Sequence, residues 1–534
     1  MPHCSERLPN LILFEDDDLL VIHKPAGWNT HAPTPYSGEG VFEWLRHREP
    51  RWATLAIIHR LDKVTSGVMV FAKSTEAKRS LTAQFTERTV TKKYLLATDR
   101  SVPRKELTVV STLRRAGDGY EQSPWRPGQE RAETSFRVTG EQAGRTLVEA
   151  TPVTGRTHQI RVHAAAEGFP IFGDVLYGGT PARRVHLHAL ELTVRHPASN
   201  EPMTFVAPAA FETDARLRLR EAIIDPAATT AFRLMNGASD GSPGTYVDRL
   251  GGFVLVQEAG VDQSLLTSAA TVWGTAPRGV YHKILNRQVR KTTAAEASPI
   301  LFAGEAAPER FEILENGVRF ELSFSEGYSV GLFLDQRDNR RRFLVNHVAA
   351  DFPLFPGGAA GHEVLNTFAY TCGFSVCAAK AGARVTSLDL SRKYLEWGRR
   401  NFSLNGLEAN AHDFIYGDAF DWMRRLAKKG RLFDAIILDP PTFSQSKETG
   451  VFRADKDYGK LVAAALPVLR PGGVLFASTN AATLKAEDFV AIVAETMVGA
   501  GRRIGRQHYV PQPPDFPVSR DEPAYLKSVW TEVS

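Results

Sequence analysis

The chain contains very little cysteine and no long apolar stretch. Its 534 residues include only three cysteines, Cys4, Cys372 and Cys377, and none has a partner at the spacing of a zinc motif. We therefore expect neither a disulfide framework nor a metal site. No apolar run is long enough to cross a bilayer, and the N-terminus turns acidic at EDDD where a signal peptide needs a longer apolar core. This predicts a cytoplasmic protein without a membrane partner.

The composition predicts folded domains throughout. Hydrophobic residues make up 43% of the chain and charged residues 23%. At the usual 100 to 200 residues per domain, this length suggests about three domains. The net charge of +5 permits a polyanionic partner without requiring one. No segment indicates a stable protein partner.

The pattern of apolar residues changes twice along the chain. Before about residue 210, short runs such as LLVIHKP, GVMVFAK and KKYLLAT alternate with turn residues, which predicts a mostly antiparallel sheet in an α+β domain. From about residue 355, short apolar strands alternate with amphipathic helices, which predicts a doubly wound parallel sheet in an α/β domain. We predict a first domain, a linker, a small central α/β domain and a last domain at residues 1–210, 211–229, 230–335 and 336–534.

The segment HRLDKVTSG places Asp62 in a turn that follows a short apolar run. Taken alone, Arg60 and Asp62 could form an ordinary surface ion pair. Two further segments follow, however: KKYLLA with Tyr94, and TGRTHQIRVHAAAEGFPIFGDVLYGG with Arg156 and Ile160. In this order the three segments resemble the signature of the RluA type of RNA pseudouridine synthase, and the resemblance covers about residues 10 to 208.

The resemblance implies a role for each of these residues, without a cofactor. Asp62 would be the catalytic carboxylate, acting as nucleophile toward the sugar or as base on a sugar proton. Arg156 would pair with Asp62, because an adjacent cation favours the charged form. Tyr94 would stack on the displaced uracil, and Ile160 would line the base site. Because the target must leave its stack, Arg60 is the candidate for holding the nucleotide outward.

The second half places acidic residues at the ends of successive predicted strands. VLNTFAYTCGF reads as a strand, a turn of small residues and a helix. Asp389, Asp418 and Asp439 then close three further strands, in VTSLDLS, YGDAF and LDPPTF. No G-x-G-x-x-G motif follows the first strand, which argues against a nicotinamide dehydrogenase. The arrangement resembles a class I methyltransferase, Rossmann-like in fold and dependent on S-adenosylmethionine.

This resemblance implies S-adenosylmethionine as the cofactor of the second half. Cys372 stands where relatives usually carry glycine. The sequence therefore differs from the family motif at the position implied to contact the methionine end of the cofactor. The residues implied in cofactor binding are Asn366, Phe368, Tyr370, Thr371, Gly373, Asp389, Asp418, Asp439 and Pro440.

Several motifs point to a narrower group. NGASDGSPGTYVDR, GLFLDQRDNR and DPPTFSQSK resemble elements of bacterial large-subunit rRNA methyltransferases of the RlmI and RlmKL kinds, over about residues 230 to 534. Asp439 and the prolines after it would then frame the target base, and Phe443 would either stack on it or pack in the core. Arg337 and Arg340 would either contact phosphates or lie on a solvated face.

The target base is predicted from a missing thiol. Methylation of cytosine at carbon 5 needs a cysteine that adds to the ring, and relatives that do this carry it near the end of the fifth strand. This chain reads LFASTNAAT there, with Ser478 and Thr479. Nitrogen 7 of guanine has a free lone pair and needs only positioning. The sequence therefore predicts guanine nitrogen 7, with cytosine carbon 5 as the alternative.

Together these motifs predict a bifunctional RNA-modifying enzyme that acts on large-subunit rRNA. The N-terminal half would isomerise uridine to pseudouridine and the C-terminal half would methylate a base. Two other interpretations stay open at this point. Only one half could be catalytic while the other binds RNA, or the methyltransferase could act on a small molecule.

Overall fold

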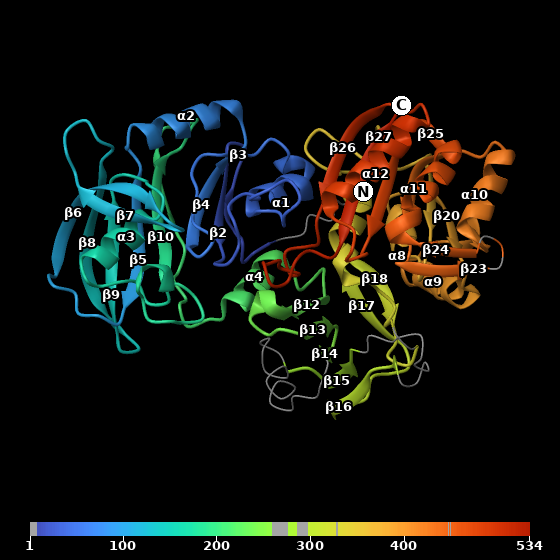
Figure 1. Cartoon of the computed structure of the whole chain (residues 1–534), viewed down its shortest axis with the longest axis horizontal. Helices are drawn as coiled ribbons and strands as arrows, with labels where there is room; N and C mark the ends of the chain where they lie inside the picture. Colours follow the sequence, from blue (N-terminus) through green and yellow to red (C-terminus); the bar gives the residue numbers. More distant parts are fainter. Residues whose placement is uncertain (1–7, 259–275, 286–296, 327–328, 447, 449) are drawn as a thin grey trace.

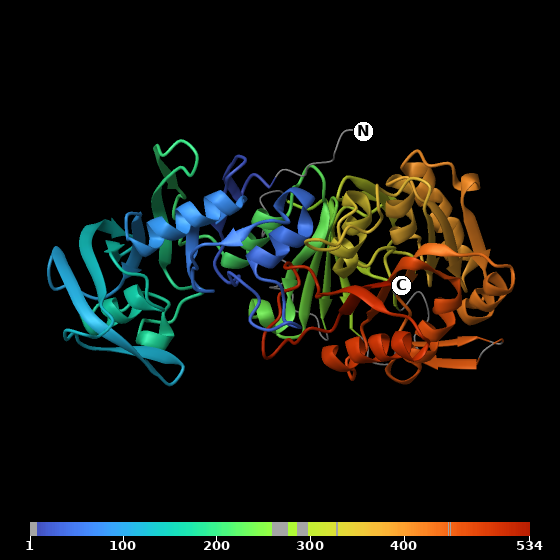
Figure 2. The ribbon, with the colours of Figure 1, turned by 90° about the horizontal axis from the view of Figure 1, so that it is seen from above.

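The computed structural model describes residues 8–258, 276–285, 297–326, 329–446, 448 and 450–534. Cys4 lies outside these residues. Three sheet-containing regions follow one another along the long axis of the molecule (Figures 1 and 2). In the part of the chain that is described, no helix has the length and apolar character needed to span a membrane.

The N-terminal region is built on an eleven-stranded sheet in the order β1-β2-β4-β10-β5-β9-β8-β6-β7, with β3 and β11 at its side. Every neighbouring pair is antiparallel except β4 with β10, which confirms the predicted mostly antiparallel sheet. β4 is buried at every position, because helices and loops cover both of its faces. The strands are β1 (Ile12–Glu15), β2 (Leu19–Lys24), β3 (Ala56–Ile57), β4 (Ser66–Ala72), β5 (Thr91–Thr98), β6 (Glu106–Ala116), β7 (Gly119–Pro124), β8 (Ala132–Gln142), β9 (Arg145–Pro152), β10 (Leu187–Arg195) and β11 (Pro202–Val206). The helices are α1 (Val41–Arg48), α2 (Thr75–Thr86) and α3 (Gln159–Ala166), with short 3-10 turns η1 (Pro50–Trp52) and η2 (Val175–Tyr177).

The central region begins inside the segment predicted as a linker. That segment contains α4 (Ala215–Ile223), which starts where the Asp214 side chain accepts a hydrogen bond from the Arg216 backbone N–H. A five-stranded sheet in the order β12-β13-β14-β15-β16 follows, together with a hairpin of β17 and β18. The elements are β12 (Ala231–Asn236), η3 (Gly237–Asp240), β13 (Thr245–Leu250), β14 (Phe253–Glu258), β15 (Gly279–Ile284), β16 (Ile300–Gly304), β17 (Phe311–Glu315) and β18 (Val318–Leu322). The domain boundaries given above stay predictions.

The C-terminal region is a seven-stranded sheet in the order β21-β20-β19-β22-β25-β27-β26. The first five strands are parallel, which confirms the predicted doubly wound sheet, and β27 pairs antiparallel with β25. The strands are β19 (Glu363–Thr367), β20 (Arg384–Asp389), β21 (Asp413–Tyr416), β22 (Phe433–Leu438), β25 (Leu469–Thr479), β26 (Ile504–Val510) and β27 (Lys527–Val533), and a separate hairpin pairs β23 (Phe443–Ser446) with β24 (Gly450–Arg453). The helices are α7 (Arg337–Val345), α8 (Gly373–Lys380), α9 (Arg392–Leu404), α10 (Ala419–Lys428), α11 (Ala454–Ala465) and α12 (Ala486–Gly499), with 3-10 turns η5 (Leu334–Gln336), η6 (Ala409–Ala411) and η7 (Leu466–Val468).

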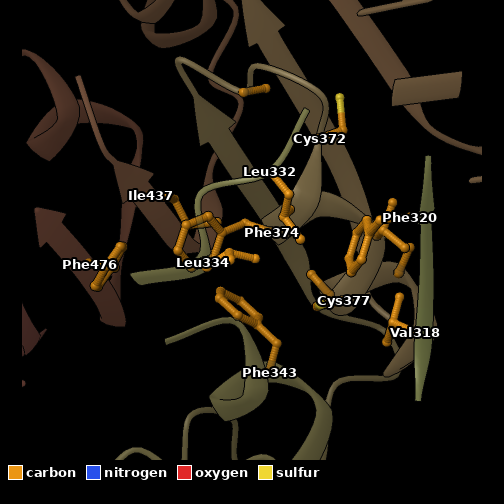
Figure 3. Close-up of a cluster of buried hydrophobic side chains, with 14 of the residues drawn as sticks. Val318, Phe320, Leu332, Leu334, Phe343, Cys372, Phe374, Cys377, Ile437 and Phe476 are labelled. Carbon is orange, nitrogen blue, oxygen red and sulfur yellow. The ribbon is translucent and has the colours of Figure 1, made fainter. Parts of the chain in front are cut away.

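Both faces of the C-terminal sheet are buried. Alternate residues of β22 belong to different cores: Ile437 packs with α7, α8 and α9, whereas Ile436 packs with α10, α11 and α12. In the first core the rings of Phe343 and Phe476 lie 6.2 Å and 5.3 Å from that of Phe374 (Figure 3). These two packed layers hold the strand ends rigidly at the carboxyl edge of the sheet.

Helix α7 corrects one prediction from the sequence. The side chains of Arg337 and Arg340 are buried, 2% and 3% exposed. Arg337 donates two hydrogen bonds to the Asp515 carboxylate, at 2.8 Å and 2.6 Å, and Arg340 donates two to Glu315, at 2.6 Å and 2.7 Å. The prediction that they contact phosphates is wrong, because a buried guanidinium already engaged with a carboxylate offers no surface to RNA. The arginines of α7 are structural.

The same helix joins the first and last regions of the chain. The Trp44 indole of α1 donates to the Asp338 carboxylate at 3.0 Å, and Arg341 pairs with Glu49. On the adjacent strand β26, the His508 ring lies 4.2 Å from the ring of His47. Figure 1 shows α1 beside β26, so the two regions contact each other directly.

Candidate functional sites

The turn that carries Asp62 is anchored by two side chains, those of Thr30 and Lys24. The Thr30 hydroxyl donates to the Leu61 carbonyl at 2.7 Å and accepts from the Leu61 N–H at 3.2 Å. The fully buried Lys24 ammonium donates to the carbonyls of Trp28, Pro25 and Lys63, at 2.7, 2.9 and 3.4 Å. Burial lowers the pKa of Lys24 to about 7, against the opposing charge of Asp62. These bonds hold the Asp62 backbone in place independently of any substrate.

Glycine is required directly after this turn. Gly67 has a φ of 123°, and a Cβ there would lie 2.2 Å from the Ala189 carbonyl oxygen. The chain can pass this close to β10 only without a side chain.

Asp62 faces a polar pocket that also contains the other predicted residues of this half. The lining residues include Arg60, Asp62, Tyr94, Arg156 and Ile160. Tyr94 comes from β5 and Ile160 from α3, while Arg156 lies in the loop before α3. The structure therefore brings together, within one pocket, residues that are up to 100 positions apart in the sequence.

The cation nearest Asp62 differs from the predicted one. The Arg161 Nη1 atom lies 3.6 Å from Asp62 Oδ2, and the His158 Nε2 atom lies 3.8 Å from it. Arg156 pairs instead with Glu130, at 3.2 Å. The predicted pair of Arg156 with Asp62 is therefore wrong in this structure. The reason is local geometry: Arg156 precedes the start of α3, whereas Arg161 lies on the helix and is oriented by a carboxylate on its other side.

Arg161 is the residue that the sequence analysis missed. It donates two hydrogen bonds to the Asp174 carboxylate, at 2.6 Å and 2.8 Å, and its guanidinium lies 4.9 Å from the centre of the Tyr177 ring. Asp174 belongs to the GD turn already noted in the sequence, and it is 1% exposed. A second arginine five positions after Arg156, followed by an aspartate in the Gly-Asp turn, was the available signal.

Burial and the charge of Asp62 act together on Tyr94. Both raise the pKa of the Tyr94 hydroxyl, with burial the larger cause, so the phenol stays protonated. Lys92 lies on the same strand and lines the same pocket, and its burial lowers its pKa. Arg60 is exposed and contacts His31 at 3.1 Å.

A second and larger pocket lies at the carboxyl edge of the C-terminal sheet. It has a cavity volume of about 370 Å³, and its lining includes Phe368, Tyr370, Asp389, Asp439 and Pro440. Of the other residues implied in cofactor binding, Asn366 and Thr371 are buried behind it and bond to Ser375 and Gly331. Gly373 starts α8, and the Asp418 carboxylate caps α10 by accepting from the Asp421 N–H at 3.0 Å. Backbone next to Asp418, at Gly417 and Ala419, lines the pocket.

In the loop between β19 and α8, every second residue from Phe368 to Cys372 has a left-handed backbone conformation. Phe368, Tyr370 and Cys372 all have positive φ, of 55°, 47° and 64°. Left-handed residues in alternation turn successive N–H groups toward one side, a geometry that suits an anionic group. The Tyr370 N–H donates to the Asp389 carboxylate at 2.8 Å, which ties the loop to the end of β20.

Cys372 does not obstruct this pocket. Its side chain is fully buried in the apolar group drawn in Figure 3, and burial raises its pKa to about 12. It packs against Gly398 of α9, where an added Cβ would lie 2.3 Å from the Cys372 sulfur. A small residue on the helix therefore compensates for a larger one in the loop.

We expect Gly398→Ala to destabilise the C-terminal domain because it overpacks this contact. The expected loss is about 1 to 3 kcal/mol in the free energy of unfolding, measured by urea denaturation. Cys372→Gly removes the opposing sulfur, so the double variant should recover most of the loss. A double variant no more stable than Gly398→Ala alone would show that the two residues are not coupled.

Asp389 ends β20 and lines this pocket. Its Oδ2 and Oδ1 atoms accept from the N–H groups of Tyr370 and Ser391, both at 2.8 Å, and burial raises its pKa.

We expect Asp389→Ala to weaken S-adenosylmethionine binding about 10-fold to 100-fold. The cofactor would lose its hydrogen bonds to the carboxylate, and the loop between β19 and α8 would lose its bond to the end of β20. Isothermal titration calorimetry measures this. Asp62→Asn, in the other pocket, is the matched control and should bind the cofactor normally.

At the far side of this pocket, Asp439 forms a small polar network. The Gln336 amide donates to Asp439 Oδ2 at 3.1 Å and to the Ser478 hydroxyl at 2.8 Å. Burial, together with the charge of nearby Asp335, raises the pKa of Asp439 to about 6. Phe443 starts the hairpin strand β23 and is half-buried, while its neighbour Ser444 lines the pocket.

Comparison with known proteins identifies both halves of the chain. Residues 258–530, more than half of the sequence, match the family model described as S-adenosylmethionine-dependent methyltransferase. The chain belongs to this methyltransferase family. Residues 18–166 match the model described as RNA pseudouridylate synthase. The protein is therefore an enzyme with an N-terminal pseudouridine synthase domain and a C-terminal methyltransferase domain whose cofactor is S-adenosylmethionine.

Individual relatives resemble the C-terminal part. A ribosomal RNA large subunit methyltransferase of Deinococcus radiodurans is 33% identical over 336 residues, which are 61% of this chain and 78% of that protein. The ribosomal RNA large subunit methyltransferase I of Pseudoalteromonas atlantica is 34% identical over 59% of this chain and 77% of its own. Among solved structures, the methyltransferase SMU.776 complexed with SAH matches with a TM-score of 0.50 and 28% identity, over 64% of this chain and 86% of that chain.

Proposed function

We propose that the protein modifies large-subunit ribosomal RNA twice, converting a uridine to pseudouridine and methylating a guanine at nitrogen 7. The substrate is inferred from the relatives, which are named as methyltransferases of that RNA. The observation that carries the choice of base is the composition of the methyl pocket. Its described lining contains three carboxylates, those of Asp335, Asp389 and Asp439, and no cysteine.

The first reaction is assigned to the pocket around Asp62. Forming pseudouridine breaks the bond from the sugar to nitrogen 1 and makes one to carbon 5, while a proton leaves carbon 5 and one is gained at nitrogen 1. An Asp62 carboxylate can attack the sugar carbon or remove a sugar proton, and both routes place it against the ribose. Arg161 supplies a fixed positive charge 3.6 Å away, and Tyr94 provides an aromatic face for the detached uracil.

The residues of the second pocket fit S-adenosylmethionine. Phe368, Tyr370 and Leu390 give apolar walls for an adenosine, and Asp389 stands where ribose hydroxyls would donate. When bound, the cofactor supplies an electrophilic methyl group on a sulfonium. The protein contributes position and electrostatics around that group.

Guanine nitrogen 7 suits this environment for an electrostatic reason. Its lone pair can take a methyl group directly, and the product base carries a positive charge. Asp439 and Asp335 both line the pocket and lie close enough to perturb each other, so their negative charge would stabilise that product. Cytosine carbon 5 requires a thiol addition, and the position offers Ser478 instead. Cys372 and Cys377 are fully buried in the apolar core.

Mass-spectrometric mapping of large-subunit rRNA tests the proposal. RNA from cells lacking the gene should miss one pseudouridine and one 7-methylguanine, with Asp62→Asn removing only the first and Asp439→Asn only the second. Loss of a 5-methylcytosine instead would overturn the choice of base. Loss of pseudouridine alone, with S-adenosylmethionine turnover that needs no RNA, would indicate a small-molecule methyltransferase.

The pKa of Asp439 adds a second readout. Because Asp439 loses its charge below about pH 6, we expect the rate of methyl transfer in single-turnover assays to fall as the pH drops through 6. Asp439→Asn should be slow at every pH and should lose this inflection.

A further inference from the structure

A second positively charged pocket lies behind the catalytic turn and plays no part in the reactions above. Its polar lining comprises Asn10, His23, Ser66, Arg184, His188, Arg218 and Glu221. Ser66 opens β4 only four residues after Asp62, at most about 14 Å along the chain. Arg218 comes from α4, so the pocket is completed by the segment that follows the pseudouridine synthase sheet.

A chain of hydrogen bonds fixes the floor of this pocket. His188 Nε2 contacts the Ala207 carbonyl at 2.9 Å and must donate to it, which makes Nδ1 the acceptor for the Ser66 hydroxyl at 2.8 Å. The Ser66 oxygen in turn accepts from Arg184 Nη2 at 2.6 Å. Arg184 is therefore held in one orientation by groups that are themselves neutral.

The charge of the pocket is not balanced by the protein. Arg184 is half-buried, and no carboxylate of the described residues lies within 4.0 Å of it; its hydrogen bonds go to Ser66 and the Val185 carbonyl. Arg218 pairs with Glu221 at 2.9 Å, but its buried Nε atom has no hydrogen-bond partner in the described structure. Burial lowers the pKa of His23 to about 4 and that of His188 to about 3, so both rings are neutral.

Two arginines and one glutamate leave one positive charge in a partly closed space. A partly buried cation without a carboxylate partner loses part of its hydration, and the bound anion would compensate for that loss. A phosphodiester carries a single negative charge and several acceptor oxygens, which matches one excess charge with unused guanidinium donors. A carboxylate ligand would match the charge, but it would leave fewer of these donors satisfied.

We propose that this pocket binds one backbone phosphate of the RNA substrate, close to the nucleotide presented to Asp62. The phosphate would contact Arg184 and Arg218 together. Such a contact anchors the strand beside the active site without touching the base, and therefore sets the register in which a uridine reaches Asp62. A free inorganic phosphate has the same chemistry and is the other possible source.

Salt-dependent RNA binding of the full-length protein tests this proposal. We expect Arg184→Gln and Arg218→Gln each to weaken binding about 10-fold. Each should also reduce the slope of log K against log salt by about 0.7 to 0.9, the change for one phosphate. The KM for pseudouridine formation should rise while kcat at saturating RNA is retained. Arg79→Gln, on the exposed surface of α2, is the matched control and should change nothing.

Two outcomes would contradict binding of an RNA phosphate in this pocket. If both variants are folded by circular dichroism and bind RNA with an unchanged slope, the pocket does not hold an RNA phosphate. If millimolar inorganic phosphate raises the Tm of the wild type but not of Arg218→Gln, and the RNA slope is unchanged, the site belongs to a free anion and the RNA source is overturned. Should Arg184→Gln fail to fold because the Ser66 bond is lost, Arg218→Gln on α4 still gives the answer.

Discussion

Replacing Asp62 with asparagine is expected to reduce pseudouridine formation by at least about 10³-fold, while methyl transfer continues at the wild-type rate. Asparagine keeps the shape of the side chain but has neither the negative charge nor a nucleophilic oxygen, and removal of a catalytic nucleophile typically costs this much or more. The anchors of the turn, at Thr30 and Lys24, do not involve the carboxylate, so the fold should be unchanged.

Purified full-length protein, large-subunit rRNA from a strain without the gene, and separate assays for the two products measure this difference. Asp118→Asn, in the exposed turn between β6 and β7, is the matched control and should be fully active. An Asp62→Asn enzyme that keeps more than a tenth of the wild-type rate would move the catalytic role to another residue of the pocket.

Arg337→Met is expected to destabilise the protein by about 3 to 5 kcal/mol, because it leaves the Asp515 carboxylate buried without its partner. The Asp515 carboxylate is 0% exposed, so water cannot replace the lost hydrogen bonds. Urea denaturation followed by tryptophan fluorescence measures the loss. The double variant Arg337→Met/Asp515→Leu, which removes both charges, should recover a large part of it.

The loss of stability expected for Arg337→Met differs from the effect expected if Arg337 contacted an RNA phosphate. A surface arginine that binds RNA weakens affinity and lowers the salt slope when it is replaced, and it leaves stability almost unchanged. Normal stability with a reduced salt slope in Arg337→Met would therefore contradict the structural role given to α7.

Local pattern predicted the fold class of both halves. Short alternating apolar runs predicted the antiparallel sheet, and apolar strands alternating with amphipathic helices predicted the parallel one. The motifs also named residues that the fold then brings together, since Asp62, Tyr94 and Ile160 line one pocket, and Asp389 and Asp439 line another. Tyr94 and Asp389 lie within strands and Asp439 directly follows one, where backbone geometry limits the position of the side chain.

Predictions that depended on side-chain direction were less successful. Arg156 and Arg161 lie in the same motif, and only the start of α3 decides that Arg161 is the one near Asp62. The arginines of α7 read as a basic surface in the sequence, yet they are buried because carboxylates distant in the chain, Glu315 and Asp515, pack against them. No local pattern records such a partner.

The sequence by itself thus determined the types of the two domains, their order and the chemistry of their motifs, because strand and helix periodicity and turn residues are local properties. The tertiary structure alone decided which cation faces Asp62, that Gly398 makes room for Cys372, and that α4 completes a charged pocket behind the catalytic turn. These features arise where residues far apart in the chain meet. Their energies depend on distance and burial, which a sequence does not specify.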